Sequence, residues 1–481
     1  MTGPGTNLRR PVRRLVAPLL AAAALVTASA PAIGGSTAAD APGDTVGTIE
    51  TSMVEMLGNI DPSKAVEMRS LRKRIAGTSD NTGAGAGIDV AIIDTGVAPV
   101  AGLDREGKVL HGPDLSGEGS SPEVAYLDTY GHGTHMAGII AGERDGAPGI
   151  APGARIVSVK VAGHDGVTTV PQVVAAIDWV IEHRNTHGMN IRVLNLSLGQ
   201  SGVSTHVGDL LSAATERAWD AGIAVVVAAG NRGDSQNHLD SPAVDPYVIS
   251  IGSTELTKTW LGERETLPTW SAKGNGSRNP DAVTLGRSIA SYRVPGSTVD
   301  RTAPGARFGD DFFLGSGTSQ SAAVTSGVVA ALLQRYPHLT PDEVKASLLH
   351  HADEIDYWST QKDGEGTIDA RSTVAYGKPW FTPIQRHTKA AGSGTGILAP
   401  ATSTWSGGDW SGASWSGASW SGTVWAGASW SGASWSGASW SGASWSGASW
   451  SGASWSGASW SGASWSSASW SGATWSGGSW S

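Results

Sequence analysis

The chain passes from a loop into a helix at residues 314–323, which read Leu-Gly-Ser-Gly-Thr-Ser-Gln-Ser-Ala-Ala. The apolar positions that follow, up to Leu333, have helical spacing, so Ser319 lies in the first turn of the predicted helix. Backbone N–H groups in that turn have no partner within the helix, and the helix dipole favours negative charge there. A serine oxygen at this place has donors beside it that can hold an anion. On this segment alone, an ordinary helix-capping serine is the simpler interpretation.

Two upstream segments favour a catalytic role for Ser319. Residues 90–96 read Val-Ala-Ile-Ile-Asp-Thr-Gly, which indicates a buried strand that ends at the carboxylate of Asp94. Residues 131–138 read Gly-His-Gly-Thr-His-Met-Ala-Gly and predict a helix that opens at His132. A strand-end aspartate alone is a common turn residue. The chain order Asp, His, Ser is nevertheless that of one type of catalytic triad.

The motifs Asp-Thr-Gly, His-Gly-Thr-His-x-Ala-Gly and Gly-Thr-Ser together resemble those of the subtilisin-like serine proteases, the subtilases. The resemblance covers residues 84–377. One departure is Ala323, where the family usually has proline. The resemblance implies a serine endopeptidase that hydrolyses peptide bonds through the triad Asp94, His132 and Ser319 and an acyl-enzyme intermediate.

The residue types suit this chemistry. A serine hydroxyl is a weak nucleophile that needs an adjacent base, which His132 would supply while Asp94 orients its ring. Negative charge on the attacked carbonyl oxygen requires donors, of which the N–H of Ser319 is one. Asn231 follows a strongly apolar predicted strand and is a turn asparagine in the simplest interpretation. The resemblance implies that Asn231 completes the oxyanion hole, because subtilases carry that asparagine after Ala-Gly.

Substrate binding is expected at two short segments. The first has an exposed backbone edge that, by the resemblance, pairs with the substrate as an added strand. The second consists of small residues that leave room for a sizeable apolar side chain, although close packing explains the same residues. The expected substrate-binding residues are Ser197, Leu198, Gly199, Ala228, Ala229 and Gly230.

No cofactor or metal is expected to be required. His132 and His135 are three residues apart, but the segment lacks the glutamate of the His-Glu-x-x-His zinc motif, and no third ligand stands at a characteristic spacing. Structural calcium is frequent in subtilases, but no loop of this chain identifies a site for it. The formal net charge of -9 argues against nucleic acid or an anionic membrane surface as a partner. Polypeptide substrates are what the resemblance to subtilases implies.

The predicted fold class is α/β. Continuous apolar strands alternate with helices between Gly87 and Ile251, which favours a doubly wound, mostly parallel sheet with helices on both faces. Functional residues of such sheets gather beyond the carboxyl ends of the strands, where Asp94 and Asn231 fall. The predicted strands cover residues 88–93, 155–161, 191–196, 223–228 and 247–251, and the predicted helices begin at His132 and cover 170–183, 204–221 and 339–351.

The 481 residues are expected to form five parts. These are a signal peptide (1–32), a pre-catalytic or pro-segment (33–83), the catalytic domain (84–377), a linker (378–404) and a repeat tail (405–481).

The signal peptide is predicted from four arginines that precede an apolar run at residues 15–26 and small residues after it. This run is too short for a transmembrane helix, and an uncleaved anchor is the alternative. No transmembrane segment is expected in the mature chain. Residues 33–83 are either an inhibitory pro-domain, as many subtilases have, or a helical extension. The protein is therefore expected to be secreted or associated with the cell envelope, and without cysteine it has no disulfides.

The tail is a low-complexity repeat of period five, Trp-Ser-Gly-Ala-Ser. Tryptophan stands at every fifth position from Trp405 to Trp480, which accounts for sixteen of the chain's 22. The pattern is similar to that of pentapeptide repeats, which form a four-sided β-solenoid, while a partly disordered tail is the alternative. The tail is expected to bind the cell envelope or to associate with itself.

Two other functions are compatible with parts of the sequence. The first is a catalytically inactive, surface-displayed binding or structural protein on the same scaffold, against which the complete triad argues. The second is another serine hydrolase such as an esterase. Its serine would stand in Gly-x-Ser-x-Gly and its triad in the order Ser, Asp, His, and the segment around Ser319 has neither feature.

Overall fold

The computed structural model describes residues 48–50, 60, 62–77, 83–121, 123–259, 262–355, 360–379, 389–390 and short strands between 404 and 480. The predicted signal peptide and most of the predicted linker lie outside the described residues. Within the described part, no helix combines the length and the apolar character that crossing a membrane requires.

The central sheet has eight strands in the order β10-β9-β8-β7-β3-β5-β4, with β11 beside β9. Every pairing in it is parallel except that of β10 with β9. This confirms the predicted mostly parallel sheet. The strands are β3 (Asp89–Asp94), β4 (Val109–Asp114), β5 (Arg155–Lys160), β7 (Ile191–Leu196), β8 (Ala224–Ala228), β9 (Ile249–Thr259), β10 (Gly262–Thr266) and β11 (Ala282–Leu285).

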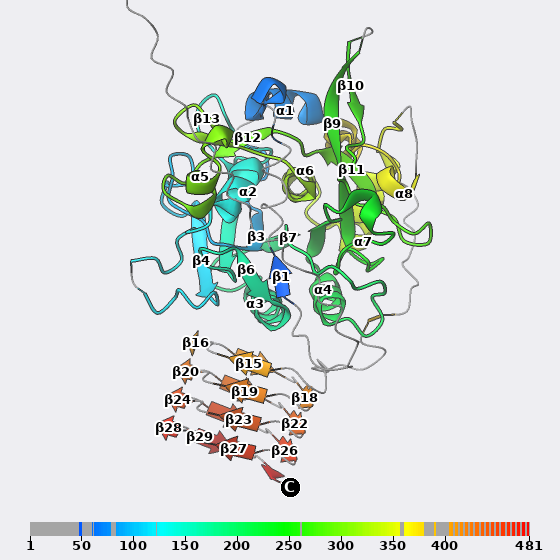
Figure 1. The fold of residues 1–481 in the computed structure, drawn as a ribbon. Helices are drawn as coiled ribbons and strands as arrows, with labels where there is room; N and C mark the ends of the chain where they lie inside the picture. Colours follow the sequence, from blue (N-terminus) through cyan, green and yellow to red (C-terminus); the bar gives the residue numbers. More distant parts are fainter. Residues whose placement is uncertain are drawn as a thin grey trace, which may run out of the picture. The chain divides into compact units, whose positions relative to one another are not determined.

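Helices cover both faces of the sheet, as predicted (Figure 1). Helices α3 and α4 lie together on one face, and α2 and α6 lie together on the other. All residues of β3 and β8 are buried, which is why β8, and β3 between its two terminal aspartates, are apolar instead of alternating. The helices of the domain are α2 (His132–Ala141), α3 (Val170–His183), α4 (Leu210–Asp220), α5 (Thr298–Thr302), α6 (Thr318–Arg335), α7 (Pro341–His350), α8 (Thr360–Asp363) and α9 (Ala370–Tyr376).

Two predicted elements differ from those observed. The helix expected over 204–221 begins only at Leu210, because the Asp209 side chain accepts a hydrogen bond from the Ser212 N–H at 2.8 Å and caps the helix there. The strand expected over 247–251 continues to Thr259, because β9 pairs with β10 as an antiparallel hairpin.

A second, smaller sheet precedes α6 and was not predicted. Its order is β13-β14-β12-β2, and β12 and β14 form an antiparallel pair that leads directly into the Ser319 segment. Its strands are β2 (Val66–Glu67), β12 (Ile289–Tyr292), β13 (Arg307–Phe308) and β14 (Phe312–Gly315).

The predicted pre-catalytic segment contributes to this domain. Helix α1 (Met68–Ala76) buries Met68, Leu71 and Ile75 in the main hydrophobic core, and β2 pairs with β12. Farther upstream, β1 (Thr48–Glu50) pairs antiparallel with β6 (Val167–Thr169). Residues 66–76 are thus part of the packed core of the domain.

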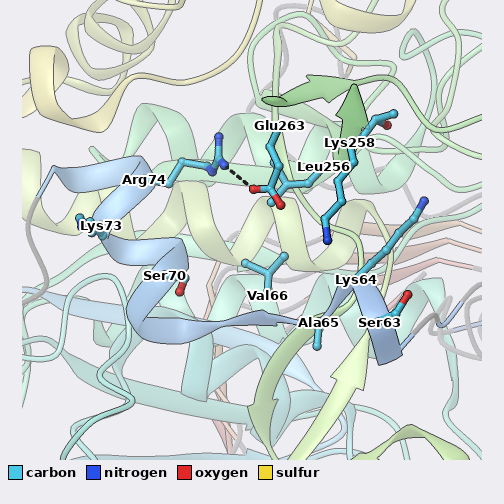
Figure 2. A pocket seen from close by; sticks show the side chains of 11 residues that line it. Ser63, Lys64, Ala65, Val66, Ser70, Lys73, Arg74, Leu256, Lys258 and Glu263 are labelled. Carbon is cyan, nitrogen blue, oxygen red and sulfur yellow. Dashed lines mark hydrogen bonds and ion pairs between the residues drawn. The ribbon is translucent and has the colours of Figure 1, made fainter. Parts of the chain in front are cut away.

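Helix α1 and the β9–β10 hairpin enclose a hollow of about 800 Å³ (Figure 2). Most of the charged side chains along it are basic, and one carboxylate, that of Glu263, lies 3.4 Å from Nη2 of Arg74. No residue of the predicted triad lines it. The charged lining residues are Lys64, Lys73, Arg74, Lys258 and Glu263.

The strands of the repeat tail form a regular pattern of their own. They run from β15 (Thr404–Ser406) to β30 (Ser479–Trp480), and they pair in parallel as four four-stranded sheets. Each strand pairs in register with the fourth strand after it, so that Trp405 stands beside Trp425. Each turn of the chain thus contains four repeats. This strand pairing is that of a four-sided solenoid, one of the two predicted alternatives.

Candidate active site

A buried pair, Asp94 and His132, joins the end of one strand to the start of one helix. Asp94 is the last residue of β3, and His132 is the first residue of α2. Both carboxylate oxygens of Asp94 lie 2.8 Å from Nδ1 of His132. Within the described residues, the other ring nitrogen, Nε2, is buried and makes no hydrogen bond. The carboxylate therefore favours the tautomer with its proton on Nδ1, and Nε2 is the atom that can accept a proton.

Asp128 supports this pair, although the sequence did not indicate it. Its carboxylate accepts hydrogen bonds from Thr95 Oγ1 (2.8 Å), from the Gly131 N–H (2.6 Å) and from the Thr134 N–H (2.8 Å). Burial raises the pKa of Asp128, and these hydrogen bonds offset only part of that rise. Asp128 satisfies N–H groups at the start of α2 and thereby fixes the turn that carries His132.

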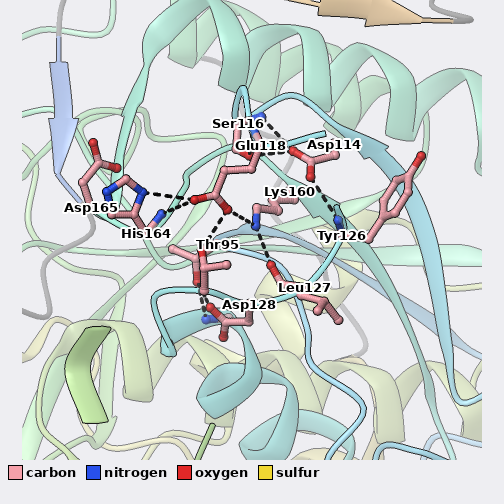
Figure 3. Close-up of polar contacts among 12 residues, drawn as sticks. Thr95, Asp114, Ser116, Glu118, Tyr126, Leu127, Asp128, Lys160, His164 and Asp165 are labelled. Atoms are coloured by element: carbon pink, nitrogen blue, oxygen red, sulfur yellow. Dashed lines mark hydrogen bonds and ion pairs between the residues drawn. The ribbon is translucent and has the colours of Figure 1, made fainter. Parts of the chain in front are cut away.

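An ion pair between a buried lysine and a partly buried glutamate holds the loop in front of Asp128 (Figure 3). Lys160 is 1% exposed, and its ammonium group donates to Glu118 Oε2 at 2.7 Å and to the carbonyl oxygen of Leu127 at 2.5 Å. Burial raises the pKa of Glu118, but hydrogen bonds, led by that from Lys160, outweigh it and lower the pKa to about 2. Glu118 is therefore ionised at neutral pH, and the bond to Leu127 fixes the residue next to Asp128.

Ser319 lies where the sequence predicts it, as the second residue of α6. Its hydroxyl donates to the carbonyl oxygen of Ser197 at 3.0 Å, and the hydroxyl of Ser197 donates to the carbonyl oxygen of Ser319 at 3.1 Å. Because Nε2 of His132 makes no hydrogen bond, the serine–histidine bond expected of a triad is absent in this conformation. The structure therefore brings Asp94 and His132 together and directs the serine oxygen to Ser197.

Asn231 is held by the residue before Ser319. Its Oδ1 accepts hydrogen bonds from the N–H of Thr318 at 2.9 Å and from the hydroxyl of Thr318 at 3.0 Å. The same hydroxyl accepts a hydrogen bond from the N–H of Gly230 at 3.1 Å. Since the amide oxygen is bound to Thr318, Nδ2 is the donor that Asn231 can offer to an oxyanion. Thr318 was not predicted, and its only sequence signal is its place in the Gly-Thr-Ser motif.

The two predicted substrate-binding segments lie side by side. Residues 197–199 follow β7, Ala228 ends β8 and residues 229–230 follow it, and these two strands are adjacent and parallel. Leu198 and Ala229 are 1% and 0% exposed, so both side chains are packed into the interior. The backbone of the second segment is already used within the domain, because the Ala229 N–H donates to the carbonyl oxygen of Ile251 and the Gly230 N–H donates to Thr318 Oγ1. Pairing of residues 197–199 with a substrate strand stays a prediction.

His135 lies within α2 and has a different role from His132. Its Nε2 lies 3.0 Å from the carbonyl oxygen of Phe313, and burial lowers its pKa to about 4. The ring is therefore neutral and links α2 to β14. Among the residues that the structure describes, no group of three or more histidine, aspartate or glutamate side chains is placed to hold a metal ion.

Comparison with known proteins identifies relatives of this domain. The sequence model described as "Subtilase family" matches residues 85–377. The chain is 33% identical over 300 residues to the serine protease AprX of Bacillus subtilis (strain 168), a match that covers 60% of this chain and 66% of AprX. It is 32% identical over 272 residues to the extracellular serine proteinase of Thermus sp. (strain Rt41A), with 56% of each chain covered.

A solved structure has a similar fold. The structure of fervidolysin from Fervidobacterium pennivorans, described as a keratinolytic enzyme related to subtilisin, matches with a TM-score of 0.52 and 26% sequence identity. The match covers 64% of this chain and 46% of fervidolysin. The chain thus spans about half to two thirds of the length of these three proteins.

Proposed function

The chain belongs to the subtilase family, and on that premise we propose that it is a serine endopeptidase whose catalytic residues are Asp94, His132 and Ser319. The observation that carries the proposal is the contact of both Asp94 oxygens with Nδ1 of His132 at 2.8 Å, in a site where both side chains are buried. A carboxylate so placed stabilises the imidazolium that forms when Nε2 takes a proton.

The reaction begins with a change in the Ser319 side chain. Its hydroxyl leaves the carbonyl oxygen of Ser197 and turns to Nε2 of His132, which removes the proton as Oγ attacks the substrate carbonyl carbon. Hydrogen bonds at catalytic sites are often incomplete before substrate binds, so the observed bond to Ser197 is compatible with this step. His132 then gives the proton to the leaving amine, and water hydrolyses the acyl-enzyme in the second half of the reaction.

The oxyanion hole is formed by Asn231 Nδ2 and the N–H of Ser319. The two bonds from Thr318 fix the amide of Asn231, so its donor is oriented before the substrate arrives. Such preorganised donors act mainly on charge that exists in the transition state, and one of them typically contributes ~3 kcal/mol.

The remaining parts of the chain are assigned by inference. Residues 1–32 direct export, in keeping with a relative named an extracellular serine proteinase. The strand Thr48–Glu50 pairs with the edge of β6, and we assign the residues before β2 to a pro-segment. Residues 66–76 contribute to the hydrophobic core, and we assign them to the mature domain. Residues 405–481 localise the enzyme, through the cell envelope or through contacts between copies.

The test is the variant Ser319→Ala, purified beside Ser277→Ala, which removes the hydroxyl of an exposed serine. The Ser319 variant should lose labelling by a fluorophosphonate and cleavage of casein while its circular dichroism and unfolding midpoint stay those of the wild type. The Ser277 variant should retain both activities. Full labelling of Ser319→Ala would show that another serine is the nucleophile.

A further inference from the structure

The hollow between helix α1 and the β9–β10 hairpin takes no part in the proposed catalysis, and we call it the α1 hollow (Figure 2). Its volume of about 800 Å³ is that of a pocket for a ligand of many atoms, so it is much larger than a site for a single small ion. Two side chains, Val66 and Leu256, give it apolar surface among the charged residues.

The charge of the α1 hollow is opposite to that of the chain. Four of the five charged residues that line it are basic, whereas the whole chain has a formal net charge of -9. Two of the four, Lys73 and Lys258, are exposed. Within the described residues, their ammonium groups make no hydrogen bond or ion pair. The hollow therefore carries positive charge that the surrounding protein does not neutralise.

The other two cations are only weakly neutralised. Nη2 of Arg74 lies 3.4 Å from Oε2 of Glu263, and both side chains are exposed, so this ion pair is weak. Nζ of Lys64 lies 3.6 Å from Oε2 of Glu255, a carboxylate that also accepts a hydrogen bond from Arg287. Lys64 can therefore turn to another anion while Glu255 keeps a partner.

The arrangement of these cations fits an extended chain that carries several carboxylates. Figure 2 shows the four basic side chains spread along the hollow instead of directed at a common point. They come from the short 3-10 helix Pro62–Lys64, from α1 and from β9. A single phosphate is held by donors that converge on it, whereas separated cations can each pair with a different carboxylate. The apolar surface of Val66 and Leu256 can be covered by the stems of the same side chains.

The α1 hollow is close to the nucleophile segment without being part of the catalytic site. Val66 on β2 pairs with Ile289 on β12, and Ile289 pairs with Gly315 on β14. Neighbouring strands are ~4.8 Å apart, so Val66 lies about 10 Å from Gly315, in the segment that leads to Ser319. One polypeptide can therefore reach both places, with the stretch in the hollow remote from the bond that is cleaved.

We propose that the α1 hollow is an exosite that binds a carboxylate-rich stretch of a polypeptide substrate. The proposal rests on the proposed function, because the bound chain is the substrate of the protease. A chain with a net charge of -9 repels acidic polypeptides, and the hollow supplies a local attraction of the opposite sign. This attraction acts between solvent-exposed groups and weakens as salt is added.

The first experiment measures the binding of fluorescein-labelled decaglutamate to the full-length chain with Ser319→Ala, which prevents turnover of the probe. Fluorescence anisotropy should show binding of decaglutamate and none of decaglutamine. The further substitutions Lys64→Gln and Lys258→Gln should together raise Kd roughly 3- to 10-fold, as expected for two solvent-exposed charge pairs. Sodium chloride at about 1 M should abolish binding, because it screens charges beyond ~3 Å.

The matched control combines Arg69→Gln with Lys273→Gln in the same Ser319→Ala chain. Arg69 lies on α1 as well, and neither of the two residues lines the hollow. The control removes the same amount of charge and should leave Kd unchanged, which separates a local contact from a general change of electrostatic potential. The unfolding midpoints of both sets of variants should match that of the parent chain.

The second experiment tests the substrate role with the active enzyme. Two p-nitroanilide peptides carry decaglutamate or decaglutamine at the amino end, joined by a flexible Gly-Ser spacer of about ten residues, which spans ~17 Å on average. The wild type should have the lower KM for the decaglutamate substrate. Lys64→Gln with Lys258→Gln should remove this difference, while kcat/KM for the same peptide without an extension stays that of the wild type.

Four results would overturn different parts of the reasoning. An equal Kd for the hollow variant and the control would show that the acidic chain binds elsewhere. Displacement of decaglutamate by inorganic phosphate, but not by chloride of the same ionic strength, would identify a small-anion site instead. Equal KM values for the two extended substrates would remove the substrate role. An enzyme that is not labelled by fluorophosphonate and cleaves neither substrate would refute the proposed function and leave the binding result in place.

Discussion

The hydroxyl of Thr318 should act as a positioning group for the oxyanion hole, and Thr318→Val tests this role. Valine has nearly the shape of threonine, so the substitution removes the hydroxyl and little else. It deletes one of the two hydrogen bonds on Asn231 Oδ1, the one of 3.0 Å, and keeps the backbone bond of 2.9 Å. It also leaves the Gly230 N–H without its acceptor.

The size of the effect follows from these bonds. One lost hydrogen bond costs about 1 kcal/mol, and complete loss of an oxyanion donor costs about 3 kcal/mol. The free-energy cost of Thr318→Val should lie between these two values, so kcat should drop by roughly 5- to 100-fold. KM should change little, because the misdirected donor acts on charge that exists mainly in the transition state. Thr318→Ser, which keeps the hydroxyl, should remain close to the wild type.

The assay is steady-state hydrolysis of one peptide p-nitroanilide by Thr318→Val, Asn231→Ala and the double variant. Asn231→Ala should lower kcat by ~10²–10³-fold. The double variant should be no slower than Asn231→Ala alone, since Thr318 acts through Asn231. If the decrease in kcat of the double variant equals the product of the two single decreases, Thr318 does not orient the oxyanion donor. The same conclusion follows if Thr318→Val retains the kcat of the wild type.

Two further predictions concern stability and the tail. Burial raises the pKa of Asp245 to about 7 from an ordinary value of 3.8. Between these two pH values the folded chain keeps a proton that the unfolded chain releases. The free energy of unfolding therefore falls as the pH rises from about 4 to about 7. The Tyr247 N–H donates to Asp245 at 2.9 Å, and Asp245→Asn keeps an acceptor for it. Urea unfolding should show that this substitution raises the free energy of unfolding more at pH 8 than at pH 5. An equal rise at both pH values would contradict the shifted pKa. A chain that ends at Pro400 should keep its kcat/KM on a small peptide and lose binding to cell-wall material or self-association on a sizing column. Loss of turnover would place the tail in the catalytic fold.

The sequence predicted five of the eight strands of the central sheet, and these five are largely buried on both faces. Strands β4, β10 and β11 were not predicted, and most residues of β4 and β10 are not buried. Strands such as β8 are apolar at every position, and this pattern differs from the polar sequences of turns and loops. The small sheet before α6 gave no such signal. β12 reads Ile-Ala-Ser-Tyr, which is too short and too mixed to show a period, although all four residues are buried. Its burial comes from packing against elements that lie far away in the sequence.

The candidate site was predictable where a motif fixes the chemistry and not where support comes from a loop. Asp94, His132 and Ser319 each stand at the end of a strong strand or helix pattern. Asp128 stands in a long loop with several other carboxylates, among them Asp114 and Glu118. Nothing in the composition of that loop distinguishes the acid that bonds to the start of α2 from the acid that pairs with Lys160.

What fills the space beside a small residue is a tertiary property, and the small residues before Asn231 illustrate why. Glycine and alanine at the end of β8 indicate that another group comes close, and the sequence is compatible both with a substrate side chain and with close packing inside the domain. In the structure, part of that space is filled by Asp240, which reaches Gly230 because the bridge between Gln200 and Ser241 folds its loop back. A small residue thus reports the close approach of a neighbour and carries no information about its charge. Which neighbour fills the space is decided by a loop residue whose position depends on two strand ends at once.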